Sequence, residues 1–298
     1  MFAEPLYLRS MTPAVVTAVL RREAGMPERI SRGRLEEIIT ALNDRDKSIL
    51  NTVRECRYIS TGQIGRLHFT DSVTAAAALK AATRNMNKLK TLNLIHSLER
   101  RIGGARSGSG SLVWRLEAAG ERILRITDGA VFPHRKRFEP SPHFLAHTLA
   151  VSECFVRMTE ICRHREMKLA EMQTEPGCWR SYGGGGRLVT LKPDLFAVTI
   201  CDDYEDRWFF ELDLDTESPV RIIEKCRKYF QYYRSGLEQK QFGIFPLVVW
   251  IVPDSGRKES VARHIKFEFS KLPKIFTVIT PDELGSLIRL GAEGGSLC

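Results

Sequence analysis

Hydrophobic and polar positions follow a regular pattern from residue 43 onward and predict three successive helices. Asn43 or Asp44 can cap a first helix that ends near Cys56, because both side chains accept hydrogen bonds from the free amides of a helix start. Ser60 is placed to cap a second, short helix, and Ser72 to open a third, longer one. Residues 1–43 are expected to form a basic, irregular extension, in which residues 15–22 and 35–42 could each form a short helix.

The third helix is expected to have two distinct faces. Leu79, Met86 and Leu89 recur at helical spacing and predict a buried apolar stripe. A second face carries polar side chains three or four residues apart, namely Lys80, Arg84, Asn87 and Lys88. This face is free to meet a polar partner.

A β-hairpin and a closing helix follow the third helix. Strand-like segments at residues 94–98 and 111–116 flank a glycine-rich tip that contains Arg100, Arg101 and Arg106. A helix is expected at 117–126. Three helices and a hairpin describe a winged helix-turn-helix over residues 44–126, with the arginine-bearing tip as its wing.

In a winged helix, the third helix enters the major groove of double-stranded DNA. The four polar residues of that helix would then contact bases and phosphates, and the three wing arginines would grip the backbone or the minor groove. The alternative is a winged helix used for dimerisation, with its charges merely solvated. A basic helix face and a basic wing occur together, which favours DNA binding.

The second half of the chain alternates between helical and strand-like patterns. Expected elements are a helix at 143–164, strands at 167–173, 187–200 and 207–214, a helix at 220–234, a strand at 245–252, a helix from 258 and a strand at 275–280. The short turns predict an antiparallel meander, and the helix after it predicts a crossover to a parallel strand. The fold class is thus mixed α/β, with residues 127–142 as a linker and 143–298 as a second domain.

Composition narrows the choice of partner and compartment. The 298 residues carry a formal net charge of +9, which favours a polyanionic partner. The seven cysteines show no disulfide or zinc spacing, as expected in a reducing cytoplasm. No apolar run approaches the ~18 residues of a membrane span, and the first residues do not resemble a signal peptide. We therefore expect a cytoplasmic, nucleoid-associated protein without a membrane partner.

Carboxylates gather at the ends of two predicted strands. Asp194 follows Lys192-Pro193, and Glu211, Asp213 and Asp215 alternate at the end of the next strand, which would place them on one face. Burying several acids together is costly unless a cation neutralises them, so the cluster points to a metal site. The alternative is a solvated strand end.

The order of these elements and acids resembles the PD-(D/E)xK nuclease superfamily. Pro193-Asp194 matches the first acid, and Glu211-Leu-Asp213 matches the second motif except that aspartate replaces the lysine. The resemblance implies that Lys225 supplies the amine from the next helix and that Glu153 is the glutamate of the first helix. It also implies a restriction-endonuclease-like domain with a mixed sheet.

That resemblance implies a metal-dependent chemistry. Asp194 and Glu211, with Asp213 or Glu153, would hold Mg²⁺ or Mn²⁺ against the scissile phosphate, and Lys225 would orient the attacking water or stabilise the transition state. The alternative is a retired nuclease fold in which the acids form salt bridges with Lys225, Arg221 or Arg187.

The chain as a whole resembles the replication-relaxation family of plasmids and integrative elements, over about residues 40 to 255. The matching motifs are Arg45-Asp46-x-x-Ile49-Leu50, Thr61-x-Gln63-Ile64, Trp114-x-Leu116, His147-x-Leu149-Ala150, Lys192-Pro193-Asp194, Glu211-x-Asp213 and Lys225-x-x-x-Tyr229. The resemblance implies a role in replication, mobilisation or DNA relaxation, with double-stranded DNA, other mobile-element proteins and a second copy of the chain as partners. One hypothesis is a metal-dependent nickase or endonuclease. The other is a non-catalytic DNA-binding accessory factor or regulator.

Three further motifs have structural explanations. Tyr232-Tyr233 lacks the His-hydrophobic-His strand that accompanies paired catalytic tyrosines and is expected in the core. His143 and His147 lie four residues apart but lack the glutamate of a zinc helix, although His147 is close enough to Glu153 to border the acidic site. The Gly183–Gly186 run lacks GK[ST] and is a turn.

Overall fold

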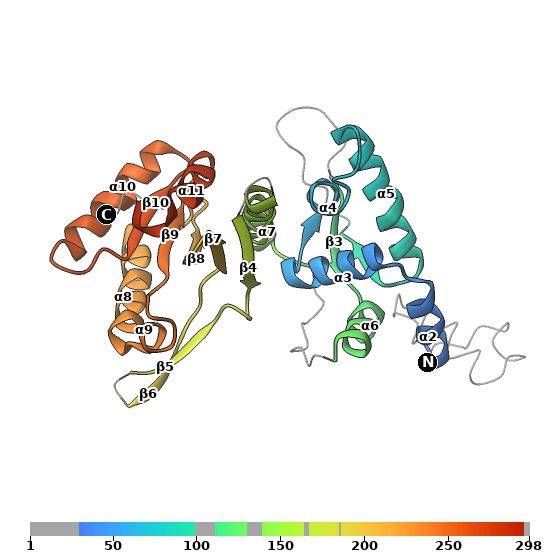
Figure 1. The fold of residues 1–298 in the computed structure, drawn as a ribbon, viewed down its shortest axis with the longest axis horizontal. Helices are drawn as coiled ribbons and strands as arrows, with labels where there is room; N and C mark the ends of the chain where they lie inside the picture. The colour runs from blue at the N-terminus through green and yellow to red at the C-terminus, as the bar shows by residue number, and fades with distance from the viewer. Residues whose placement is uncertain (1–29, 99–110, 130–138, 164–166, 185, 295–298) are drawn as a thin grey trace, which may run out of the picture.

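The computed structural model describes residues 30–98, 111–129, 139–163, 167–184 and 186–294. It forms two lobes on either side of the long helix α7 (Pro142–Arg163), as Figure 1 shows. We refer to α2 through α6 as the N-terminal lobe and to β4 through α11 as the C-terminal lobe. In the described part of the chain, no helix is both long and apolar enough to cross a lipid bilayer.

The N-terminal lobe contains helices around a small antiparallel sheet of order β1-β3-β2. Its elements are α2 (Arg32–Ala41), α3 (Asp44–Cys56), β1 (Ile59–Ser60), α4 (Thr61–His68), α5 (Ala75–Thr91), β2 (Ile95–Ser97), β3 (Val113–Leu116) and α6 (Ala118–Asp128). The predicted caps Asn43 and Ser60 are confirmed, since their side chains accept hydrogen bonds from helix amides. The third helix begins at Ala75, capped by Thr74, three residues later than predicted.

The apolar stripe of α5 is confirmed for Met86 and Leu89, which are fully buried. It is wrong for Leu79, which is 45% exposed. Helix α4 approaches α5 at Ala78, where a Cβ added to Gly65 would lie 3.6 Å from the Ala78 carbonyl oxygen. Ala78 therefore faces the core in place of Leu79.

The C-terminal lobe is built on a mixed five-stranded sheet of order β10-β9-β8-β7-β4. Its elements are β4 (Met167–Thr174), β5 (Arg180–Gly184), β6 (Arg187–Leu191), β7 (Leu195–Cys201), β8 (Tyr204–Leu212), α8 (Pro219–Ser235), α9 (Leu237–Phe242), β9 (Leu247–Ile251), α10 (Ser255–Phe269), β10 (Phe276–Ile279), η2 (Pro281–Glu283) and α11 (Leu284–Gly294). Strands β4, β7 and β8 are antiparallel neighbours, and β8, β9 and β10 are parallel neighbours. The predicted meander, crossover and mixed α/β class are confirmed.

One strand prediction was wrong. The segment expected as a single strand at 187–200 forms two strands, because Lys192-Pro193 interrupts it. Strand β6 pairs with β5 in a separate hairpin, whereas β7 joins the main sheet. This break positions Asp194 at the start of β7.

Side chains alternate across β8 and fill two apolar layers. Phe209 packs against Tyr229 of α8 on one face, in an apolar cluster that also includes Ile265 of α10. Trp208 and Phe210 pack with α7 and α11 on the other face. Burial of such aromatic side chains stabilises the sheet by roughly 25 cal/mol for each Å² of apolar surface removed from water.

Helix α7 belongs to the cores of both lobes. Val156 is part of the N-terminal apolar cluster, and Leu145 packs with Tyr58. Met158 and Cys154 belong to the cluster of the C-terminal lobe. The helix therefore fixes the two lobes to each other.

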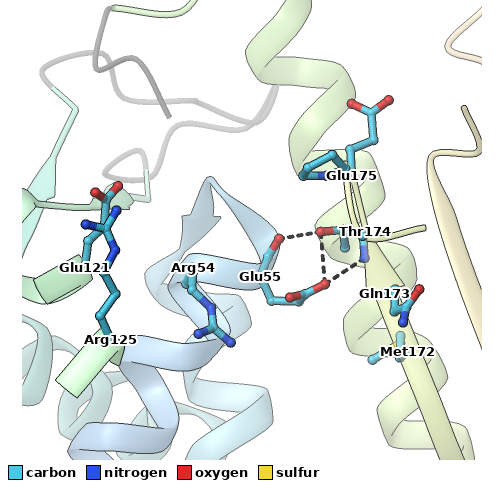
Figure 2. A pocket seen from close by; sticks show the side chains of 10 residues that line it. Arg54, Glu55, Glu121, Arg125, Met172, Gln173, Thr174 and Glu175 are labelled. Atoms are coloured by element: carbon cyan, nitrogen blue, oxygen red, sulfur yellow. Dashed lines mark hydrogen bonds between the residues drawn. The ribbon is translucent and has the colours of Figure 1, made fainter. Parts of the chain in front are cut away.

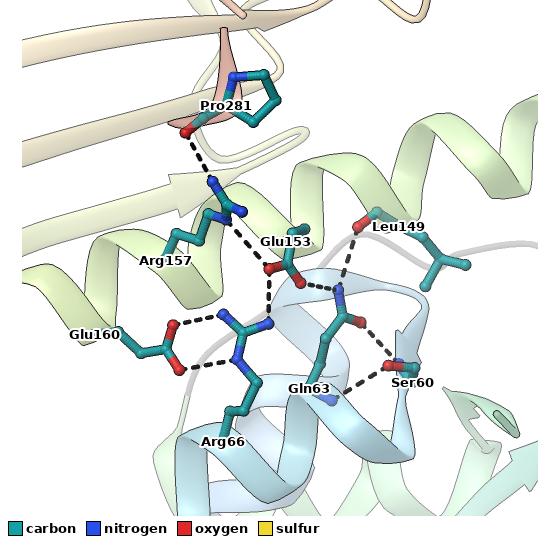
Figure 3. A network of polar contacts seen from close by, with 8 residues as sticks. All are labelled: Ser60, Gln63, Arg66, Leu149, Glu153, Arg157, Glu160 and Pro281. Carbon is teal, nitrogen blue, oxygen red and sulfur yellow. Dashed lines mark hydrogen bonds and ion pairs between the residues drawn. The ribbon is translucent and has the colours of Figure 1, made fainter. Parts of the chain in front are cut away.

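Polar contacts support the same junction. Figure 3 shows Arg66 of α4 bound to Glu153 and Glu160 of α7, at 2.7 Å for the Nη1–Oε1 contact with Glu153. Arg157 continues the network to the carbonyl oxygen of Pro281. These bonds connect the N-terminal lobe through α7 to the C-terminal lobe.

A second junction lies between α3 and the edge strand β4. The Thr174 amide donates to the Glu55 carboxylate at 2.7 Å, and the Thr174 hydroxyl donates to the Glu55 carbonyl (Figure 2). Beside these bonds is a cavity of about 420 Å³, lined by residues of α3, α6 and β4. The last residue of edge strand β4 is thus bonded to the N-terminal lobe.

Candidate functional site

Two acids meet at one end of the central sheet. Asp194 precedes β7 and Glu211 lies near the end of β8, and the register of the two antiparallel strands pairs Leu195 with Phe210. The Asp194 Oδ2 atom accepts a hydrogen bond from the Leu212 amide at 2.8 Å. Asp194 is 6% exposed and Glu211 is 0% exposed, so both carboxyls are removed from water.

Lys225 of α8 lies between these carboxyls. Its Nζ atom contacts Oε2 of Glu211 and is 3.9 Å from Oδ1 of Asp194. Ser218 caps the start of α8, and Pro219 occupies its first turn, which fixes where the helix begins. The buried face of α8 then directs Lys225 toward the sheet, so the structure brings together the two acids and the amine that the sequence assigned to one site.

Two other side chains complete the group. The Nε2 atom of His147, on α7, is 3.3 Å from Oδ1 of Asp194. The hydroxyl of Tyr229, on α8, donates to Oε1 of Glu211. We call these five residues, His147, Asp194, Glu211, Lys225 and Tyr229, the Asp194 cluster.

The cluster shifts the pKa values of its members in different directions. Burial alone would raise the pKa of Asp194, but Lys225 and His147 outweigh it and lower this pKa. Burial raises the pKa of Glu211 well above its usual range, with Lys225 offsetting part of the effect and Asp194 adding to it. Burial would lower the pKa of Lys225, yet the two carboxyls raise it. The hydrogen bond to Asp194 raises the pKa of His147. Two carboxyls with opposite shifts are typical of acid–base sites.

Asp213 is placed differently from Glu211. Strand β8 ends at Leu212, so the alternation that predicted a common face stops before Asp213. Asp213 is 2% exposed, and its Oδ2 atom accepts from Nε of Arg257 at 2.7 Å. The same guanidinium contacts Asp215 at 3.2 Å, and its Nη2 atom donates to the carbonyl of Glu217. Arg257 thus neutralises Asp213 outside the Asp194 cluster.

Glu153, the predicted glutamate of the first helix, contacts the N-terminal lobe. It accepts from Gln63 and Arg66 and pairs with Arg157 (Figure 3). Glu153 and Asp213 both line a cavity of about 140 Å³ between α7 and the end of β8. The structure therefore brings these two residues to one cavity, separate from the contacts of Lys225.

The predicted DNA-binding residues of α5 are all exposed, namely Lys80, Arg84, Asn87 and Lys88. Lys88 is also a structural residue, since its Nζ atom is 2.6 Å from the fully buried Asp46. The predicted wing residues Arg100, Arg101 and Arg106 lie outside the described residues. The helix face is available to a partner, with Lys88 held at its edge.

The tyrosine pair belongs to the core, as predicted. Tyr232 is 4% exposed and its hydroxyl donates to Glu238 at 2.7 Å. Tyr233 packs against Phe245. His143 is exposed on the first turn of α7, so it and His147 do not act as a pair.

Sequence reasoning gave no role to two residues at or near the site, although Tyr229 stands in the family motif Lys225-x-x-x-Tyr229. Tyr229 lies four residues after Lys225 on α8, and this helical spacing could have indicated a shared face. Arg257 begins α10 after a buried strand, and no local pattern connects it to Asp213. Only the assembled sheet shows that contact.

The Asp194 cluster contains two carboxylates that are candidate metal ligands, Asp194 and Glu211. Across the described ranges, no three His, Cys, Asp or Glu side chains are arranged to hold a metal ion. Magnesium, however, is commonly held by one or two carboxylates, with water and substrate phosphates as its other ligands. The ammonium of Lys225 already occupies the space between the two carboxyls, in contact with Oε2 of Glu211 and 3.9 Å from Oδ1 of Asp194. A divalent ion held by Asp194 and Glu211 would take the place of this ammonium, and these two carboxylates are the residues that would hold Mg²⁺ or Mn²⁺ there.

The fold and the site define a mixed α/β protein with two buried carboxyls and a lysine at one end of its sheet. The replication-relaxation family matches residues 50–248, more than half of the chain. The chain belongs to this family, which suggests a role in the replication or relaxation of plasmid or mobile-element DNA. No curated protein and no solved structure matches the chain.

Proposed function

We propose that this protein binds plasmid or mobile-element DNA and cleaves a phosphodiester bond at the Asp194 cluster with Mg²⁺ or Mn²⁺. The observation that supports it is the convergence of Asp194, Glu211 and Lys225 at the end of β7 and β8. Charges buried in this way are costly, and apolar residues of the same volume are often at least as stabilising. Strongly shifted pKa values in such a cluster are typical of functional sites.

The arrangement also compensates for the lysine that the nuclease motif has at position 213 and this chain lacks. Asp213 stands where the motif has lysine, and it is neutralised by Arg257. Lys225 reaches the two acids from α8 instead. The site keeps two acids and one amine, with the amine supplied by a helix.

Each residue has a role in the proposed reaction. A bound divalent ion neutralises phosphate charge and lowers the pKa of water. Asp194 and Glu211 would hold this ion, and Lys225 would stabilise negative charge that develops on the phosphate. His147 and Tyr229 orient the two carboxyls through their hydrogen bonds.

We assign the DNA-binding role to the N-terminal lobe as a winged helix. Its helices α3, α4 and α5 precede the strands β2 and β3, and β1 completes a three-stranded sheet. Helix α5 exposes Lys80, Arg84 and Asn87, whose chemistry suits bases and phosphates of the major groove. The double-stranded DNA would then be held by the lobe that α7 fixes to the cluster.

Cleavage of supercoiled plasmid in Mg²⁺ or Mn²⁺ tests this function. The substrate should carry the DNA that flanks the gene for this chain. We expect conversion to open-circle or linear DNA with the wild type, and loss of conversion in Asp194→Asn and in Glu211→Gln. Asp215→Asn is the matched control, because the Asp215 side chain is 63% exposed. No conversion, or conversion that survives both cluster substitutions, contradicts the proposal.

A second candidate function, that of a non-catalytic DNA-binding protein, is favoured because basic side chains of the protein itself neutralise the buried acids. Lys225 balances the cluster and Arg257 balances Asp213, so the fold is complete without an added ion. This is compatible with a non-catalytic DNA-binding accessory factor or regulator. Sequence-specific binding that is unaffected by divalent ions, together with no cleavage, would identify that function.

A further inference from the structure

A basic groove lies beside the Asp194 cluster, where the end of β6 meets α8. It has a volume of about 410 Å³. Its charged lining residues are Lys192, Arg221, Lys225, Lys228, Glu217 and Glu224. Bases outnumber acids in this lining, so the groove favours an anionic ligand.

We propose that this groove binds the phosphodiester backbone of a single DNA strand and leads it to the Asp194 cluster. The inference rests on the proposed function, since it names the path by which that substrate reaches the site. Lys225 belongs to both places: it lines the groove, and its ammonium group contacts Glu211. A phosphate in the groove is therefore next to the buried acids.

The spacing of the bases fits a chain of phosphates. Arg221, Lys225 and Lys228 recur at helical intervals along one face of α8. From Arg221 to Lys228 the helix rises by about 10 Å, at 1.5 Å per residue. A stacked strand advances by about 3.4 Å per nucleotide, so this row spans roughly three nucleotides. A single small anion would use only part of it.

The groove bases are also free to bind a ligand. Within the described residues, Lys192, Arg221 and Lys228 have no carboxylate at ion-pair distance, whereas Arg227 on the same helix pairs with Glu268 at 2.7 Å. Lys192 is held in place by its Nζ atom, which lies 4.3 Å from the ring centroid of Trp179. Three exposed cations thus border the groove, none of them paired with a carboxylate of the described residues.

The path accommodates one strand better than a duplex. The acids that the strand must reach are buried, and Lys225 both lines the groove and contacts Glu211. Positively charged grooves that follow one backbone are the usual mode of single-strand binding. The duplex would remain on the N-terminal lobe.

The test measures binding of a labelled single-stranded DNA oligonucleotide to the full chain in EDTA, across a range of salt concentrations. The double variant Arg221→Gln/Lys228→Gln removes two groove charges, and Arg227→Gln/Arg234→Gln removes two charges from the same helix elsewhere. Each phosphate contact contributes about 0.7 to the slope of log K against log salt for single strands. We expect the groove variant to lower this slope by about 1.4 and the affinity several-fold, and the control variant to leave the slope unchanged.

Measurements of duplex binding and plasmid cleavage distinguish failure of the groove proposal from failure of the proposed function. Duplex affinity should be equal in both double variants, because α5 is unchanged. Equal single-strand slopes in the two variants overturn the groove assignment. Absence of plasmid cleavage by the wild type overturns the proposed function and leaves the single-strand slopes to decide on the groove. Restoration of the slope by Arg221→Lys/Lys228→Arg shows that charge, and not a change of fold, is responsible.

Discussion

Tyr229 and Glu211 form a hydrogen bond between two fully buried side chains, across the space between α8 and β8. The tyrosine hydroxyl occupies Oε1 of the carboxyl and leaves Oε2 to Lys225. This division of the two oxygens holds the glutamate in one orientation. Burial raises the pKa of the Tyr229 hydroxyl well above its usual range, so it remains a donor.

Substitution Tyr229→Phe should destabilise the protein by about 1–3 kcal/mol, because it leaves a buried carboxyl oxygen without its donor. Urea unfolding followed by circular dichroism measures this. Tyr233→Phe is the matched control, since its hydroxyl has no hydrogen-bond partner within the described residues. Equal unfolding midpoints for the two variants would show that the buried bond contributes nothing to stability.

Substitution Lys225→Met should destabilise the protein by about 3–5 kcal/mol, because it leaves two buried carboxyls without their cation. The loss should shrink as the pH falls and the carboxyls take up protons. Lys228→Met, on the exposed face of α8, should stay within about 0.5 kcal/mol of the wild type. Guanidinium unfolding at several pH values measures both variants. A pH-independent loss in Lys225→Met would exclude uncompensated charge as its cause.

The contact between His147 and Asp194 should make stability depend on pH at both ends of the range. The pKa of His147 is raised in the folded state, so its contribution is fully present below its unfolded pKa, about 6.5, and is lost as pH rises through the folded value. The pKa of Asp194 is lowered, so its contribution is present above its unfolded pKa, about 3.9, and is lost as pH falls through the folded value.

The variant His147→Gln tests the histidine contribution to the pH dependence of stability, which is lost as the pH rises. Its urea midpoint should change less than that of the wild type between about pH 6 and pH 8, around the ordinary histidine pKa. His143→Gln, at an exposed position of the same helix, is the control and should behave as the wild type. Parallel curves for His147→Gln and the wild type would contradict a histidine–aspartate contribution.

Lys88 and Arg84 should separate stability from DNA binding. Lys88→Ala removes the cation that pairs with buried Asp46, so it should lower both stability and duplex affinity. Arg84→Ala changes an exposed side chain and should lower duplex affinity alone, with stability within about 0.5 kcal/mol of the wild type. Thermal melting and fluorescence anisotropy on the same samples measure the two quantities. Unchanged duplex affinity in Arg84→Ala would remove α5 from the proposed interface.

Local signals account for the elements that the sequence predicted well. Asn43 and Ser60 cap helices through bonds that depend only on residues three positions away. The burial of Met86 follows from helical spacing in the same way. Leu79 was wrongly predicted to be buried, because its exposure depends on where α4 approaches α5.

The sequence predicted those residues of the candidate site that lie at the end or start of a strand. Asp194 and Glu211 were found because acids interrupt apolar strand patterns, while Lys225 entered only through a family resemblance. Asp213 was grouped with Glu211 because the end of β8 at Leu212 is not visible in an alternating pattern. The pairing of Asp213 with Arg257 depends on the parallel crossover from β8 to β9, which brings the start of α10 to the end of β8.

Helix α7, which both lobes share, lies between them in the order of translation. The N-terminal lobe leaves the ribosome before α7, and so without Val156 and Leu145, which complete its apolar contacts. Helix α7 in turn exposes Met158 and Cys154 until strands β7 and β8 have been made. The N-terminal apolar cluster is therefore complete only once α7 has been translated, and Met158 and Cys154 are covered only once β7 and β8 follow.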